Sequence, residues 1–155
     1  NEWASTVANE LKKEIDFKIY ISSNETSISI TSEIQNNING DYNLVVCLTE
    51  SNIINWQKDG GNDIEDYEHN HVLRTVLMHA TLSNANYLAG QQIIKTINYD
   101  LATLEQENID YSNNTSVGGN GNSGGWNASN MSIVAYIYNT ITKEIAQVEE
   151  AHLNN

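Results

Sequence analysis

Apolar residues recur with two different periods along the 155-residue chain. Over residues 3–14 they return every four positions, at Trp3, Val7 and Leu11, which predicts an amphipathic helix with one apolar stripe. From Phe17 onward the period changes to two, as in strands with one face toward the core and one toward solvent. The alternating segments are 17–21, 28–34, 42–48, 92–101, 131–138 and 143–152.

Residues 69–80 fit two periods. Val72, Val76 and Ala80, with the leucines between them, fit the stripe of a helix. Val72, Val76 and Met78, with His71 and Thr75, fit a strand equally well. Periodicity alone therefore leaves helix and strand open for this segment.

Two segments interrupt the alternation. Residues 50–68 form an excursion, and its isoleucines and Trp56 suggest that it folds back on the body while its Gly, Asn and Asp tip stays in solvent. Residues 102–128 are predicted to form a long loop with a glycine-rich stretch. We expect high mobility over 112–126, which buries little apolar surface, and we expect order to resume at Trp126.

These segments amount to about seven strands after one short helix, joined mostly by turns of hairpin length. The prediction is a mainly β protein, an antiparallel β-sandwich of the immunoglobulin-like or jelly-roll-like kind with a short N-terminal helix. Residues 1–14 would be a connecting helix and residues 15–155 the sandwich domain. The Val45 and Cys47 side of the 42–48 strand is also apolar, so we expect both faces of that strand to be partly covered.

The charge balance excludes two classes of partner. The chain has 20 acidic residues against 7 Lys and Arg, for a formal net charge of -13. Nucleic-acid binding needs a basic face, and so does docking of the folded surface on anionic lipid. Cys47 is the only cysteine, so the chain has no internal disulfide, and its apolar neighbours predict a small buried hydrophobe.

Candidate chemistry is concentrated in residues 67–74, from Tyr67 to Arg74. His69 and His71 are two apart and would project to one face of a strand, where two imidazoles could approach a metal. The chain has neither paired-cysteine zinc signatures nor a His-Glu-x-x-His helix. We therefore expect no metal, no cofactor and no catalytic residue, and keep a metal-dependent hydrolase using His69 and His71 as an alternative.

Arg74 is the only arginine and lies within an apolar run. An unpaired charge there would be costly, so we expect its planar guanidinium to find a carboxylate or several backbone carbonyls. Glu50, at the end of the 42–49 strand, is the first candidate if that strand lies beside 70–79. Asp66 and Glu68 are the fallbacks.

The string Tyr67-x-His69-Asn70-His71-Val72-Leu73-Arg74 resembles the signature of the 28-kilodalton outer-membrane-protein-related lipoproteins of Bacteroides-like bacteria. Three further segments resemble the same family: residues 40–50 with their Thr-Glu corner, Ile53-Ile54 with Gln57, and the closing hairpin at 134–145. The resemblance favours a strand for residues 69–80. It implies a binding or structural motif made of Glu50, Gln57, Tyr67, His69, His71 and Arg74.

The resemblance also implies a cellular location. Members of that family carry a lipidated N-terminus, a thioredoxin-like domain and then a β-sandwich, and this chain resembles the last of these. We expect a domain of the cell envelope, at the outer membrane, held there only by a lipid anchor outside this chain.

The leading functional hypothesis is a non-enzymatic binding or assembly domain that holds an unknown protein or glycan through the 50–68 and 102–128 loops. The alternative from the resemblance is an accessory domain to a thioredoxin-like neighbour, which this chain does not contain.

Overall fold

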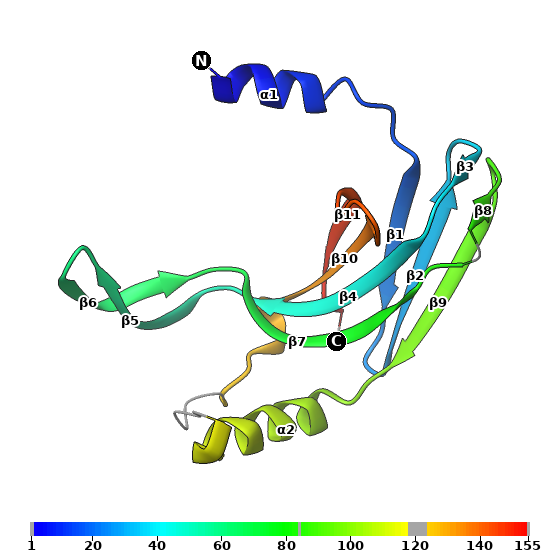
Figure 1. Ribbon diagram of the computed structural model, residues 1–155. Helices are drawn as coiled ribbons and strands as arrows, with labels where there is room; N and C mark the ends of the chain where they lie inside the picture. Colours follow the sequence, from blue (N-terminus) through cyan, green and yellow to red (C-terminus); the bar gives the residue numbers. More distant parts are fainter. Residues whose placement is uncertain (1, 84, 118–123, 155) are drawn as a thin grey trace.

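The computed structural model describes residues 2–83, 85–117 and 124–154, which contain eleven strands and two α-helices (Figure 1). In chain order these elements are α1 (Glu2–Glu10), β1 (Phe17–Ser23), β2 (Ser27–Ile34), β3 (Ile38–Asn39), β4 (Tyr42–Glu50), β5 (Ile53–Asp59), β6 (Asn62–His69), β7 (Val72–Thr81), β8 (Asn86–Tyr87), β9 (Gln92–Asn98), α2 (Leu101–Asn113), β10 (Met131–Asn139) and β11 (Ile145–His152). Two 3₁₀ turns, Thr115–Val117 and Ala128–Asn130, lie between α2 and β10.

Two antiparallel sheets pack face to face, as predicted. One has the order β1-β2-β9 and the other the order β11-β10-β4-β7. The alternating apolar residues of both sheets point between them and form one core. Its fully buried members include Phe17, Ile28, Ile30, Ile34, Leu44, Val46, Leu48, Met131, Ile133 and Ile137. Each such side chain contributes about 1.5–3 kcal/mol relative to exposure.

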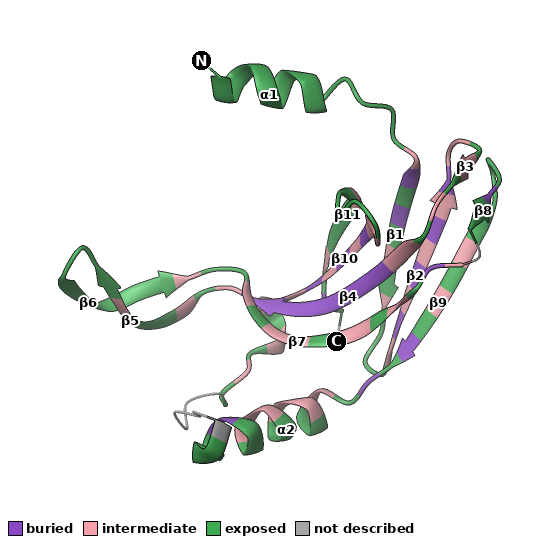
Figure 2. Ribbon diagram, in the orientation of Figure 1, coloured by how far each residue is buried: buried purple, intermediate pink, exposed green. Residues whose placement is uncertain are grey.

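β4 is the central strand of the larger sheet, between β10 and β7. All residues from Leu44 to Glu50 are buried, on both faces of the strand (Figure 2). This confirms the expectation that both faces of this strand are at least partly covered. Cys47 is buried among them, as its apolar neighbours predicted.

The expected loop at 102–128 is wrong over its first half, because residues 101–113 form the helix α2. Asp100 caps it, with Oδ1 accepting from the amide of Thr103 at 2.7 Å. Leu101 and Leu104 then pack against the core, and their burial offsets the conformational entropy that the chain loses when the helix forms. Of the segment expected to be mobile, residues 118–123 lie outside the described residues. Trp126 packs against the core, where we predicted an anchor.

The expectation that residues 50–68 fold back on the body is also wrong. β5 and β6 pair as an antiparallel hairpin that projects away from the sandwich (Figure 1). Ile54 and Trp56 remain exposed on it, so the hairpin has apolar side chains and no cover from its own domain. The following segment is the strand β7, as the resemblance favoured.

The N-terminal helix forms as predicted but ends at Glu10, and none of its described residues is buried. Trp3 and Val7 of its apolar stripe, and Leu11 just beyond its end, are exposed. No helix within the described residues has the length and apolar content that crossing a membrane requires.

Candidate binding face and the corner that frames it

The outer face of the β11-β10-β4-β7 sheet carries an apolar surface opposite the core. Directly paired residues of antiparallel strands project to the same face. Val45 pairs with Tyr136 on one side and with His79 on the other, and Tyr136 pairs in turn with Val148. Val148 is more than half exposed, whereas Val45 in the middle of the row is buried by its neighbours.

A second row runs parallel to the first. Cys47 pairs with Val134 and with Val76, and Val134 pairs with Glu150. Val76 is exposed and Val134 is partly buried, so this row extends the apolar surface. We call the two rows together the outer face: Val45, Cys47, Val76, His79, Val134, Tyr136, Val148 and Glu150.

A polar cluster closes one end of the outer face. The ring nitrogen Nε2 of His79 lies 2.8 Å from the hydroxyl of Tyr138, and the amide nitrogen Nδ2 of Asn43 lies 3.2 Å from each of these groups. Lys143 places Nζ 6.0 Å from the centre of the Tyr138 ring. An imidazole and a phenol hydroxyl at the edge of an apolar surface can orient a polar group of a ligand.

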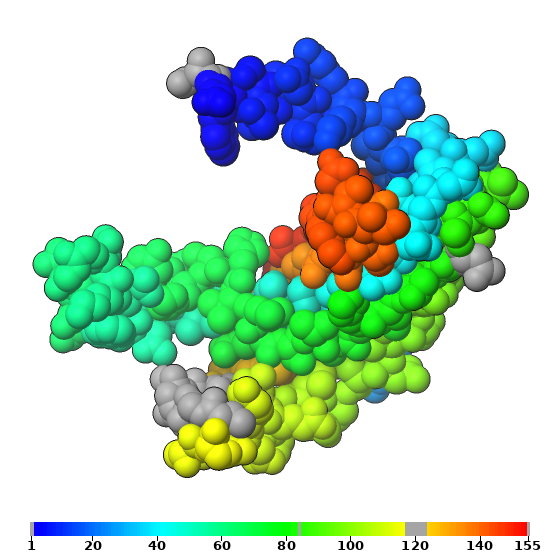
Figure 3. All heavy atoms as spheres, viewed as in Figure 1, coloured from blue at the N-terminus to red at the C-terminus, as the bar shows by residue number. Residues whose placement is uncertain are grey.

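Two projecting elements frame the outer face. Figure 3 shows the molecule hollowed between α1 and the β5–β6 hairpin, with the turn between β10 and β11 beside the hollow. On the α1 side, Thr6, Val7, Glu10 and Leu11 line a mostly apolar groove together with residues 145–148 of β11.

The hairpin leaves the sheet at a sharp corner made by two pairs of residues. Asn70 Oδ1 accepts from the backbone amide of Asn52 at 3.0 Å, and Ser51 Oγ accepts from the amide of His71 at 3.0 Å. Asn52 and His71 both adopt left-handed backbone conformations, with φ of 59° and 54°. Such residues turn the chain sharply, so the corner redirects both strands at the same level.

An ion pair locks the base of this corner. Nε of Arg74 donates to Oε2 of Glu50 at 2.8 Å, and the side chains are only 13% and 3% exposed. The other carboxylate oxygen of Glu50 accepts from the amide of Asn127 at 3.0 Å. The guanidinium carbon of Arg74 lies 5.8 Å from the centre of the Trp126 ring.

The same cluster attaches α2 to the sheet. Asn108 on α2 donates through Nδ2 to the carbonyl of Arg74 at 2.9 Å. Oε1 of Glu105, also on α2, accepts from the amides of Gly125 and Trp126 at 2.6 and 3.0 Å. Arg74 is therefore a structural junction of β4, β7, α2 and the 124–127 segment.

The structure separates the remaining motif residues. His69 ends β6 and contacts the ring of Tyr67 edge-on, with ring centres 4.8 Å apart. His71 lies in the corner, so the expected projection of both histidines to one strand face is wrong. Its Nε2 is 3.7 Å from Oε1 of Glu150 in an exposed pair. Gln57 lies further out on β5.

The hydrolase alternative finds no support in this geometry. Within residues 2–83, 85–117 and 124–154, no group of three or more His, Cys, Asp or Glu side chains comes close enough to hold a metal. Burial raises the pKa of the Cys47 thiol, and Sγ donates to the carbonyl of Val134 at 3.6 Å. Both effects favour the neutral thiol, so Cys47 is not an activated nucleophile.

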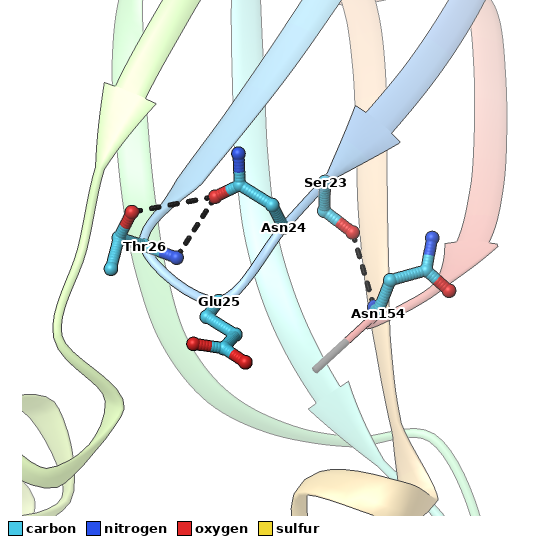
Figure 4. A pocket seen from close by; sticks show the side chains of 5 residues that line it. All are labelled: Ser23, Asn24, Glu25, Thr26 and Asn154. Atoms are coloured by element: carbon cyan, nitrogen blue, oxygen red, sulfur yellow. Dashed lines mark hydrogen bonds between the residues drawn. The ribbon is translucent and has the colours of Figure 1, made fainter.

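A second hollow lies at the turn between β1 and β2 and is lined by residues 23–26 and Asn154 (Figure 4). Its polar groups stabilise the turn itself. Asn24 Oδ1 accepts from the amide of Thr26 at 3.0 Å, and the amide of Asn154 donates to Ser23 Oγ at 3.1 Å. We therefore regard this hollow as part of the turn and not as a ligand site.

These features define an antiparallel β-sandwich domain with a projecting hairpin and an apolar outer face that is exposed at Val76 and Val148. A family model described as outer membrane protein Omp28 matches residues 1–155, and the chain belongs to this family. Membership places it in the cell envelope, at the outer membrane. No curated protein matches the chain. Among solved structures, it is similar to a domain of the outer membrane lipoprotein Omp28 from Porphyromonas gingivalis, with 16% identity, a TM-score of 0.45, and coverage of 92% of this chain and 91% of that chain.

Proposed function

We propose that this domain is a non-enzymatic binding module of the outer membrane whose outer face holds an apolar segment of a protein partner. The observation that carries the proposal is the pair of cross-strand rows, in which exposed Val76 and Val148 flank Tyr136 and the nearly covered Val45. A contiguous apolar surface on a folded domain is typical of an interaction site.

The chemistry of the outer face favours a protein over a glycan. Its middle consists of aliphatic side chains, Cys47 and Tyr136, while its other hydrogen-bonding groups lie at the Asn43–His79–Tyr138 end and at Glu150. A sugar presents hydroxyls in all directions, and each buried hydroxyl needs a partner. A helical peptide segment with an apolar face satisfies most of its own backbone hydrogen bonds and so needs few such partners. A free polar group at its end can reach the cluster at the end of the outer face.

The fixed corner supports the same proposal. The Glu50–Arg74 pair and the Asn52–Asn70 contact hold the base of the hairpin, so the hairpin forms one wall of the hollow. Preorganised walls reduce the ordering cost of binding. Within the proposal, residues 1–14 connect this domain to the rest of the protein, and a lipid anchor outside these residues attaches it to the membrane.

The test maps the binding surface with selected peptides in place of the natural partner. Peptides are selected from a random displayed library on the immobilised domain and then titrated into ¹⁵N-labelled domain. We expect amide shifts concentrated at residues 45–47, 76–79, 134–138 and 148–150. Shifts concentrated on the β1-β2-β9 sheet, or selection of no peptide binder while a glycan array gives hits, would overturn the proposal.

A further inference from the structure

α1 lacks the packing that a helix of its length needs. It spans nine residues, and none of its described residues is buried. Isolated helices shorter than about 12–15 residues are marginal in water, so most helical stability has to come from packing of an apolar face. The apolar stripe of α1 consists of Trp3 and Val7 and is continued by Leu11 just after the helix, and Trp3 and Leu11 are each 81% exposed.

The nearest surface that could cover this stripe belongs to β11. Val7 and Leu11 line one wall of a groove, and Ile145 and Val148 line the other. Ile145 pairs with Tyr138 and Val148 pairs with Tyr136, so this wall is continuous with the outer face. Both walls are apolar and both are exposed, and contact between them would remove both from water.

The attachment of α1 directs it to this place. The chain enters β1 at Phe17, whose carbonyl accepts from Nε2 of Gln147 on β11 at 3.1 Å. Lys13, in the connection, contacts Glu10 of α1 at 2.8 Å and Glu144 beside β11 at 3.7 Å. These exposed pairs contribute little energy, but a tether of a few residues gives α1 a high effective concentration above β11.

We propose that α1 is a built-in cover that closes onto β11 and the adjoining edge of the outer face, and that a partner must displace it. In the closed arrangement Trp3, Val7 and Leu11 pack on Ile145, Val148 and Tyr136. The cover therefore regulates access to the site, and this regulatory role rests on the proposed function. The closing itself does not depend on that function.

Two measurements test the cover, and they are linked. If α1 is closed about nine-tenths of the time, amide exchange at Val7 to Leu11 slows about tenfold relative to an unstructured peptide. The apparent affinity of a selected peptide is then reduced by the same factor. We expect Val148→Asp to abolish the exchange protection, and Ile94→Asp, on the outer face of the other sheet, to leave it unchanged.

The second measurement uses Leu11→Asp, which removes the closed state without touching the outer face. We expect the selected peptide to bind this variant more tightly than the parent. The gain in affinity should equal the factor by which amide exchange at Val7 to Leu11 is slowed in the parent. Exchange at α1 as fast as in an unstructured peptide would overturn the cover and leave the proposed function standing. Protection of α1 with no gain in affinity would overturn its regulatory role. Peptide-induced amide shifts on the β1-β2-β9 sheet would instead overturn the proposed function. The amide exchange of α1 would still show whether α1 closes onto β11.

Discussion

Arg74 donates through Nε to Oε2 of Glu50 at 2.8 Å, across the pairing of β7 with β4. Both side chains are nearly removed from solvent, and the second oxygen of Glu50 is bonded to the amide of Asn127. The pair therefore joins the corner at the base of the hairpin to the segment that leads into β10. It confirms the partner expected for the only arginine of the chain.

Arg74→Ala should lower the free energy of unfolding by about 3–5 kcal/mol, because it leaves the Glu50 carboxylate buried without its cation. Arg74→Lys should recover only part of this loss, since an ammonium cannot reproduce the planar guanidinium. Urea unfolding at neutral pH measures both, with Lys18→Ala as a control that removes an exposed cation. A loss below about 1 kcal/mol for Arg74→Ala would mean that the pair behaves as an exposed one.

His71 stabilises the corner at the base of the hairpin through its backbone conformation more than through its imidazole. Its φ is 54° and its side chain is 65% exposed. We predict that His71→Asn changes stability by less than about 0.5 kcal/mol, because Asn tolerates the left-handed region. His71→Val should cost about 1–2 kcal/mol, because a β-branched residue does not tolerate it. Thermal unfolding compares the two, and a larger loss for His71→Asn than for His71→Val would show that the imidazole itself stabilises the corner.

Stability should decline in alkaline solution. Burial raises the pKa of the Cys47 thiol above its ordinary value of 9.0, and burial raises the pKa values of Tyr87 and Tyr99 above 10.0. The unfolded chain then loses these protons first, so the stabilisation is complete below pH 9 and falls as pH rises through the folded pKa values. Urea unfolding between pH 8 and pH 11 should show this decline.

Cys47→Ala is the matched control for that experiment. Relative to its own stability at pH 8, we expect this variant to begin its decline about one pH unit later, where the tyrosines titrate. Identical profiles for the variant and the parent would show that the thiol plays no part in the alkaline loss.

Local pattern is sufficient to predict much of the sandwich. The two-residue period gives the faces of β1, β2 and β10, because side-chain alternation reports burial directly. Glu50 is predictable as the partner of Arg74 because a lone guanidinium in an apolar run must be neutralised. The helix α2 escapes prediction because the glycine-rich tail dominates the pattern of 102–128. Asp100 before Leu101 and Leu104 is the capping signal that could have revealed it.

The outer face could not be predicted from the sequence, for a different reason. His79 and Tyr138 are 59 positions apart, and Asn43 and Tyr138 are 95 apart. Their meeting depends on the order of β10, β4 and β7 and on two register shifts between β4 and β7. The outward course of the hairpin depends likewise on the two left-handed residues of the corner, which composition does not indicate.

Binding of a selected peptide to two charge variants tests the central claim most directly. Val76→Asp and Ile94→Asp each place a carboxylate at an exposed apolar position, one on the outer face away from the α1 groove and one on the other sheet. We predict that Val76→Asp weakens the peptide affinity, measured by isothermal titration, at least about tenfold, or about 1.4 kcal/mol, while Ile94→Asp changes it by less than about twofold. Equal affinities for the two variants, or a larger loss for Ile94→Asp, would contradict the assignment of the outer face as the binding surface.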